Sequence, residues 1–250
     1  MSGHSKWAKI KHKKGAEDAK RGMVFTKVSK EITAAAKDGG GNTETNIRLR
    51  AAIQRARGVN MPAANIDNAI KKGTGELPGI VYENVTFDAY APGGVAVLIE
   101  GLTDNKNRTT AEVRNMLSKK GGSLAGPGST AFLFTKKGYI SVDKTKSTED
   151  ALMDIVLEAG AEDLNAEGDT FDITCDPGSL EAVKAALAAK NIETQTAEVT
   201  MVPTSTVKVT GTQVKPLLDL MEALEDHEDI QHVHANFDIS EEDMAKASEE

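Results

Sequence analysis

The spacing of apolar residues changes after residue 73 of this chain, and the change constrains the kinds of structure that it can form. Up to residue 73, apolar residues recur every three to four positions, which is the period of one face of an α-helix. After the glycine- and proline-containing stretch 73–79, they alternate with polar residues, which is typical of half-buried β-strands. We therefore expect an α+β protein with a helical front part, residues 1–80, and a sheet-containing rear part, residues 81–250.

Three amphipathic helices are predicted in the front part, over residues 16–37, over residues 45–57 and from about Pro62 to Lys72. Their apolar stripes consist of Val24, Val28, Ile32 and Ala35, then Leu49, Ala52, Ile53 and Ala56, then Ile66, Ala69 and Ile70. Short helices that each carry one apolar face can bury these faces against one another. Residues 16–73 are therefore predicted to form a three-helix bundle.

The rear part is predicted to alternate short strands and helices. The strands are expected at 85–89, 95–100, 131–134, 139–142, 170–174, 195–201, 205–209 and 230–237, with a turn at Lys137-Gly138. The helices are expected at 107–120, 148–159, 180–190 and 214–225. This irregular order favours α+β layers over a long parallel sheet. Residues 241–250 are predicted to be a frayed acidic tail.

The charge of the chain is divided between its two parts. Residues 1–80 hold 16 of the 30 Lys and Arg and 7 of the 38 Asp and Glu, a net charge of +9 that leaves −17 on the rear part. This asymmetry indicates a basic arm for a polyanion on an acidic body. The alternative is that charge segregates by accident over solvated helix surfaces.

Candidate nucleic-acid contacts are therefore the cations of the front part and one aromatic residue among them. They are Lys6, Trp7, Lys9, Lys11, His12, Lys13, Lys14, Lys20, Arg21, Lys27, Arg48, Arg50, Arg55, Arg57, Lys71 and Lys72. Lysine neutralises phosphate, arginine can also read base edges, and Trp7 could stack on a nucleobase. Trp7 could instead anchor the arm on the bundle.

Signals for catalysis, metal or membrane binding are weak. The single cysteine, Cys175, cannot form an internal disulfide and is too few for a cysteine-based zinc site. His227, His232 and His234 lack a third ligand at a usual spacing, so we interpret them as polar positions of an edge strand and the turn before it. We expect no enzyme, no cofactor, no metal, no small-molecule substrate and no membrane contact, because no apolar run approaches the ~20 residues of a membrane span. We also expect a cytoplasmic monomer.

Three segments carry a resemblance to a known family. They read GHSKWAKIKHKKGAEDAKRG over residues 3–22, NIRLRAAIQRARGVNMPAANIDNAIKKGTG over 46–75 and YENVTFDAYAPGGVAVLIEGLTDNKNRTTAEVR over 82–114. The chain resembles the YebC/PmpR family from residue 3 to about residue 240. That family includes bacterial proteins described as probable transcriptional regulators and the mitochondrial translational activator of cytochrome c oxidase. The lack of a transit extension before the first motif favours a bacterial cytoplasmic member.

The resemblance implies three domains, with the third inserted within the second. The first would be the basic arm and helical bundle, residues 1–80. The second would be an α+β domain of residues 81–131 plus 204–240, and the third would be the inserted α+β domain of residues 132–203, leaving 241–250 as the tail.

A nucleic-acid-binding regulator of gene expression is the function that these observations favour. One version is a DNA-binding transcriptional regulator, and the alternative is a ribosome-associated translation factor that binds rRNA or tRNA. Charge alone leaves both open, since both polymers offer phosphate. An enzyme with its site in the α+β cleft and an adaptor that binds a basic protein through the acidic body are the remaining alternatives.

Overall fold

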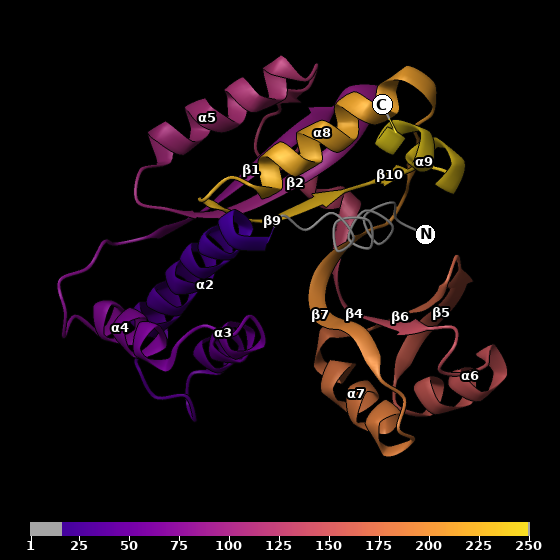
Figure 1. Ribbon diagram of the computed structural model, residues 1–250, viewed down its shortest axis with the longest axis horizontal. Coiled ribbons are helices and arrows are strands. Elements are labelled where there is room, and N and C mark those ends of the chain that lie inside the picture. Colours follow the sequence, from indigo (N-terminus) through magenta and orange to yellow (C-terminus); the bar gives the residue numbers. More distant parts are fainter. Residues whose placement is uncertain (1–16, 250) are drawn as a thin grey trace.

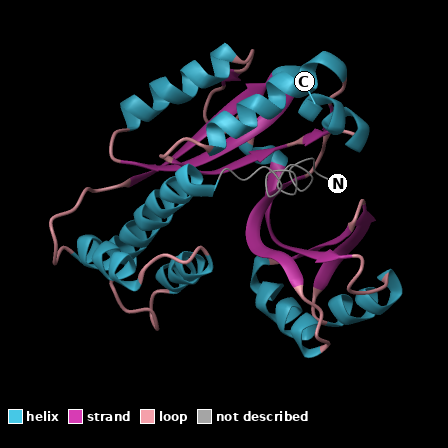
Figure 2. Cartoon of the chain, in the orientation of Figure 1, coloured by secondary structure: helices cyan, strands magenta, loops and turns pink. Residues whose placement is uncertain are grey.

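The computed structural model describes residues 17–249 as a mixture of helices and strands (Figure 1). A helical region comes first and consists of α2 (Glu17–Gly39), α3 (Ile47–Gly58) and α4 (Ala63–Thr74). Two sheet-containing units follow it, so the α+β expectation is confirmed. Figure 2 shows the helical region and the second sheet as separate lobes on one side of the first sheet, while α5 (Lys106–Lys119) and α8 (Val214–Glu225) cover its other side.

The helical region has an aliphatic core of its own. The predicted stripe of α3 is confirmed, since all four of its members are buried. The stripe of α2 is shorter than predicted, because Val24 is 38% exposed. Buried Asn46 joins the two helices: its side chain accepts a hydrogen bond from the Leu49 amide at 3.0 Å and donates one to the Ala35 carbonyl at 2.8 Å. Asn46 thus caps α3 and fixes the loop between α2 and α3.

Close packing holds α4 against α2. A Cβ atom at Gly73 would lie 2.4 Å from the carbonyl oxygen of Thr33, which is closer than any real contact of this kind. Only glycine lets the two backbones approach this far. Gly73 therefore belongs to the packing of the bundle, and α4 continues past it to Thr74.

The first sheet is antiparallel and has the strand order β3-β1-β2-β9. Its strands are β1 (Glu83–Ala91), β2 (Val95–Thr103), β3 (Ser123–Leu124) and β9 (Ile230–Ala235). Alternate residues of β2, such as Val97 and Ile99, pack with Leu217 and Leu220 of α8 in one core. The side chains of Ala96 and Leu98 belong to a second cluster with Phe134 and Met201, which connects the two sheets.

The second sheet lies in sequence between β3 and β9 of the first. Its order is β5-β6-β4-β7, with β4 (Phe134–Asp143), β5 (Ala161–Glu167), β6 (Thr170–Cys175) and β7 (Thr194–Pro203). Two helices pack in its core, α6 (Glu149–Glu158) and α7 (Leu180–Ala189). The strands β8 (Val207–Lys208) and β10 (Phe237–Asp238) form a separate parallel pair. The third unit is thus inserted within the second, while the boundaries expected for the domains stay a prediction.

Three sequence predictions for the rear part are wrong. Instead of a hairpin at Lys137-Gly138, β4 runs unbroken, because Gly138 marks close packing: a Cβ there would lie 2.6 Å from the Cys175 sulfur. Strand β5 was not predicted, since its residues AEDLNAE show little apolar alternation. The expected frayed tail at 241–250 forms helix α9 (Glu241–Glu249), because Met244 is buried in the core and the Asp243 amide donates a hydrogen bond to the Ser240 hydroxyl.

None of the helices between residues 17 and 249 is long and apolar enough to cross a membrane.

Candidate nucleic-acid interface

The predicted contacts divide into those that the structure describes and those that it does not. Lys6, Trp7, Lys9, Lys11, His12, Lys13 and Lys14 lie outside the described residues. Lys20 and Arg21 belong to the first turns of α2, where only the backbone is described. Contact of the arm with nucleic acid therefore stays a prediction.

Two lysines of α2 face the rear part of the chain, and we refer to Lys27 and Lys30 as the inner cations. The Lys27 ammonium donates a hydrogen bond to the Glu225 carbonyl at the end of α8, at 2.5 Å. The Lys30 ammonium lies 2.6 Å from a carboxylate oxygen of Asp229, and both residues are buried. The structure thus places Lys27, a predicted nucleic-acid contact, at an internal interface, and Lys30 was not predicted at all.

Asp229 is the centre of this interface. Besides Lys30, it accepts hydrogen bonds from the Arg108 guanidinium and the Thr109 hydroxyl, each at 2.7 Å. Burial alone would raise the pKa of Asp229, but the hydrogen bonds from Lys30, Thr109 and Arg108 outweigh it and hold the pKa well below its usual range. An ionised Asp229 therefore connects α2 and α5 at the start of β9.

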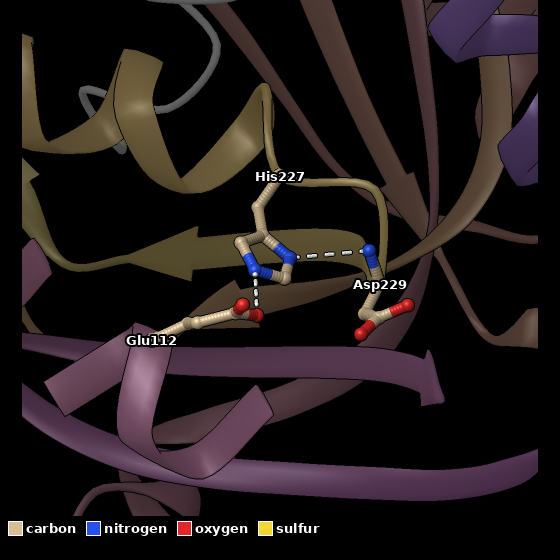
Figure 3. A group of neighbouring side chains, drawn as sticks. All are labelled: Glu112, His227 and Asp229. Carbon is tan, nitrogen blue, oxygen red and sulfur yellow. Dashed lines mark hydrogen bonds and ion pairs between the residues drawn. The ribbon is translucent and has the colours of Figure 1, made fainter. Parts of the chain in front are cut away.

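A possible metal cluster lies beside this interface, formed by Glu112, His227 and Asp229 (Figure 3). The Asp229 amide donates to Nδ1 of His227 at 3.1 Å, so Nε2 carries the proton that faces Glu112 at 2.9 Å. Both ring nitrogens are engaged, and the Asp229 carboxylate contacts two cations. We therefore interpret the cluster as a fastening of the α8–β9 turn to α5. Glu112 was missed because it lies 115 residues from His227 in the sequence.

The predicted arginines of α3 are exposed but mostly engaged within the helical region. Arg48 pairs with Asp38 at 2.7 Å and Arg55 pairs with Glu31 at 2.8 Å, which fastens α3 to α2. Arg50 donates to two backbone carbonyls of the preceding loop, those of Thr43 and Glu44. Exposed ion pairs are worth only ~0–1 kcal/mol. Arg48 can therefore exchange Asp38 for a phosphate at little cost, whereas Arg55 would leave Glu31, whose side chain is only 18% exposed, without its counter-charge.

Four other cations of the helical region are exposed and have no ion pair within residues 17–249. These outer cations are Lys37, Arg57, Lys71 and Lys72. Lys37 and Lys72 line one cavity of about 220 Å³ between α2, α4 and the chain that follows. Lys37 was not predicted, although its place in the last turn of α2 was a usable signal. Cations in last turns also stabilise helix dipoles, which is the alternative interpretation of all four.

The junction of the helical region with both sheets is unsuited to phosphate. A cavity of about 290 Å³ lies there, and the described side chains of its lining include one cation, Lys27, and three carboxylates, Glu198, Glu225 and Asp226. Burial, followed by the charge of Arg55, lowers the pKa of His232 in this lining to about 4, so the ring is neutral near pH 7. The described lining of this cavity therefore offers an anionic backbone fewer counter-charges than the outer cations do.

Phe132 offers a described alternative to Trp7 as a stacking aromatic. It is 73% exposed and follows a loop that buried Asp88 holds, since Asp88 accepts hydrogen bonds from the amides of Gly128, Thr130 and Ala131. Burial would raise the pKa of Asp88, but these hydrogen bonds lower it. An exposed ring on a fixed backbone is suited to stacking on a base. No local pattern distinguishes this exposed phenylalanine from Phe134, which is buried.

Comparison with known proteins covers nearly the whole chain. Residues 5–76 match the model of the TACO1/YebC protein N-terminal domain, and residues 82–237 match the TACO1/YebC second and third domain. A probable transcriptional regulatory protein of Syntrophus aciditrophicus is 53% identical over 249 residues, which are 99% of this chain and 100% of that one. Another, of Desulforapulum autotrophicum, is 52% identical over 242 residues, 97% of this chain and 98% of that one.

A solved structure supports the same assignment. The crystal structure of the conserved hypothetical protein Aq1575 from Aquifex aeolicus has a TM-score of 0.79 and 43% sequence identity, and the match covers 91% of this chain and 95% of that one. The resemblance expected from the sequence motifs is therefore confirmed, and the names of the relatives support a regulatory role. The chain belongs to the TACO1/YebC family.

Proposed function

We propose that this protein is a DNA-binding regulator of transcription without catalytic activity. The observation that carries the proposal is the outer cations, Lys37, Arg57, Lys71 and Lys72, which are exposed and unpaired within residues 17–249 while the rear part carries a charge of −17. Its relatives are named probable transcriptional regulatory proteins, and these names favour DNA over other polyanions as the ligand. As a DNA-bound bacterial regulator it acts in the cytoplasm.

The proposed mechanism is an electrostatic grip. The outer cations, together with the lysines of the arm, neutralise phosphates, and Arg48 adds to them by exchanging its carboxylate partner. The acidic rear part repels the DNA and so orients the protein with its helical region toward the duplex. Contact with about six phosphates would give a slope of log K against log salt near −5.

The test is the salt dependence of binding to a duplex DNA. The triple variant R57A/K71A/K72A is expected to bind more weakly and to reduce the slope by about 2 to 3, because each phosphate contact contributes ~0.9. The control K184A/K190A/K208A removes the same charge from the half-buried Lys184 and the exposed Lys190 and Lys208 of the rear part, and is expected to keep the wild-type slope. Equal slopes for both triple variants, or no binding of DNA at low salt by the wild type, would overturn the proposal.

The same variants distinguish the translational alternative from the transcriptional proposal. Wild type and R57A/K71A/K72A are compared for binding to duplex DNA, to structured RNA and to purified ribosomes. Preference for ribosomes that vanishes after RNase treatment, with weak binding to DNA, would replace the transcriptional proposal by the translational one.

A further inference from the structure

A second cationic surface lies on the acidic rear part of the chain. It is a cavity of about 680 Å³ between the end of α5, the start of α8 and α9. Four lysines line it, together with two aspartates: Lys119, Lys120, Lys215, Lys246, Asp219 and Asp243. The cavity adjoins the helices that cover the first sheet on the side away from the helical region (Figure 1), so it is separate from the outer cations.

The composition of the rear part makes this gathering unexpected. Residues 81–250 contain 14 Lys and Arg against 31 Asp and Glu. Four of those fourteen cations nevertheless line one cavity, and two carboxylates accompany them among the side chains that the structure describes. A lining with the average composition of the rear part would be acidic, whereas the described lining of this cavity has an excess of two positive charges.

Both carboxylates of the lining are already engaged. Asp219 pairs with Lys120 at 2.9 Å. Asp243 accepts a hydrogen bond from the Ser240 hydroxyl at 2.7 Å, in the cap of α9. The charge of Asp219 is thus paired with Lys120, and that of Asp243 acts on Lys246, so neither carboxylate pairs with Lys119 or Lys215.

Two ammonium groups of the cavity lack an acidic partner. Lys246 pairs with Glu242, one turn away on α9, at 2.6 Å. Lys119 and Lys215 have no ion pair among residues 17–249, although Lys215 is half-buried. A cation that is partly withdrawn from water loses hydration, and an anion in the cavity would compensate for that loss. Gly211, Pro216 and Ala247 are small or compact and leave the space between the lysines open.

We propose that this cavity binds a phosphate-bearing anion. Lysine binds phosphate as a point charge from several directions, so two to four ammonium groups around one space suit an anion with more than one phosphate. The volume lies within the ~300–1,000 Å³ typical of small-molecule sites. The same chemistry fits a free oligophosphate or the phosphodiester backbone of a nucleic acid, and the site does not depend on the proposed function of the outer cations.

The first experiment is calorimetric titration of the full chain with inorganic pyrophosphate at low ionic strength. The variant K119A/K215A is expected to bind pyrophosphate at least about tenfold more weakly than the wild type. The control K190A/K208A removes two exposed lysines elsewhere on the rear part and is expected to stay within about twofold. Thermal unfolding of each variant verifies that the fold is kept, since none of the four lysines is fully buried.

The second experiment repeats the comparison with a single-stranded oligonucleotide. Loss of pyrophosphate binding alone in K119A/K215A identifies a free oligophosphate as the ligand, and loss of oligonucleotide binding alone identifies a phosphodiester backbone. If K119A/K215A matches K190A/K208A with both probes, the inference is overturned. If R57A/K71A/K72A binds DNA as the wild type does while K119A/K215A loses either probe, the proposed function fails and the cavity stands.

Discussion

The inner and outer cations of the helical region have opposite environments although α2 carries members of both groups. Lys27 and Lys30, in the middle of α2, contact the carbonyl and carboxylate groups of the rear part. Lys37, two turns further on, is exposed and has no ion pair within residues 17–249. The comparison teaches that a count of basic residues locates a cationic region, while the position of partner groups decides which cations remain available to a ligand.

Burial explains why the two groups differ so strongly. Lys30 and Asp229 have lost water, so each depends on the other and on Arg108 and Thr109 for compensation. The Arg48–Asp38 pair is about as short, but both of its side chains remain largely in water. Ion pairs of equal length therefore differ in what their removal costs.

The largest expected effect comes from removing the charge of Asp229. The variant Asp229→Asn is expected to lower the free energy of unfolding by about 3–5 kcal/mol, because it leaves the buried Lys30 without its counter-charge. Asp38→Asn, the matched exposed pair, is expected to cost at most about 1 kcal/mol. Urea unfolding followed by circular dichroism at pH 7 measures both. Similar losses in the two variants would contradict the distinction between inner and outer cations.

Lowering the pH is expected to destabilise the same interface through protonation of His232. Its pKa in the folded chain is about 4, against 6.5 for an ordinary histidine, so the unfolded chain takes up a proton more readily as the pH falls. The stabilisation that comes from keeping this ring neutral is complete above pH 6.5 and is lost toward pH 4, by up to about 3 kcal/mol.

His232→Gln removes this titration. Urea unfolding at intervals between pH 6.5 and 4 is therefore expected to show a shallower loss of stability in His232→Gln than in the wild type. The carboxylates with lowered pKa, Glu100 and Asp229, also cost stability as the pH falls and remain in both proteins. Parallel pH profiles would show that His232 is not held neutral beside the inner cations.

The smallest effects separate single lysines. Lys27→Ala is expected to cost about 1–2 kcal/mol of stability, because the Glu225 carbonyl loses a charged donor, while the slope of DNA binding against salt stays unchanged. Lys37→Ala is expected to cost at most about 0.5 kcal/mol and to reduce that slope by ~0.9. The reverse pattern, with stability lost at Lys37 and the slope reduced at Lys27, would exchange the proposed roles.

Local patterns were sufficient to predict the elements of the helical region. The stripe Leu49, Ala52, Ile53 and Ala56 is buried as its spacing requires, since each helix presents one apolar face to the others. Gly138 misled the prediction of β4, because a glycine in a turn and a glycine in a tightly packed strand look alike in sequence.

The candidate interface was predictable only in outline. The charge asymmetry located it in the front part, but the partner of Lys30 is 199 residues away, and no local pattern connects Lys30 to Asp229. The surplus of lysines in the cavity beside α8 was likewise hidden, because they are distributed over three separate helices within an acidic sequence. The nucleic-acid contacts expected at residues 6–14 stay a prediction.

The junction at Asp229 also has a consequence for the order in which the protein assembles during synthesis. The helical region contains its own core and can form as soon as it leaves the ribosome. Its anchoring carboxylate, however, belongs to the last tenth of the chain, as does β9, which completes the first sheet. Until the segment around Asp229 has been synthesised, Lys30 lacks this partner and is left hydrated and accessible to the nucleic acids that surround the ribosome.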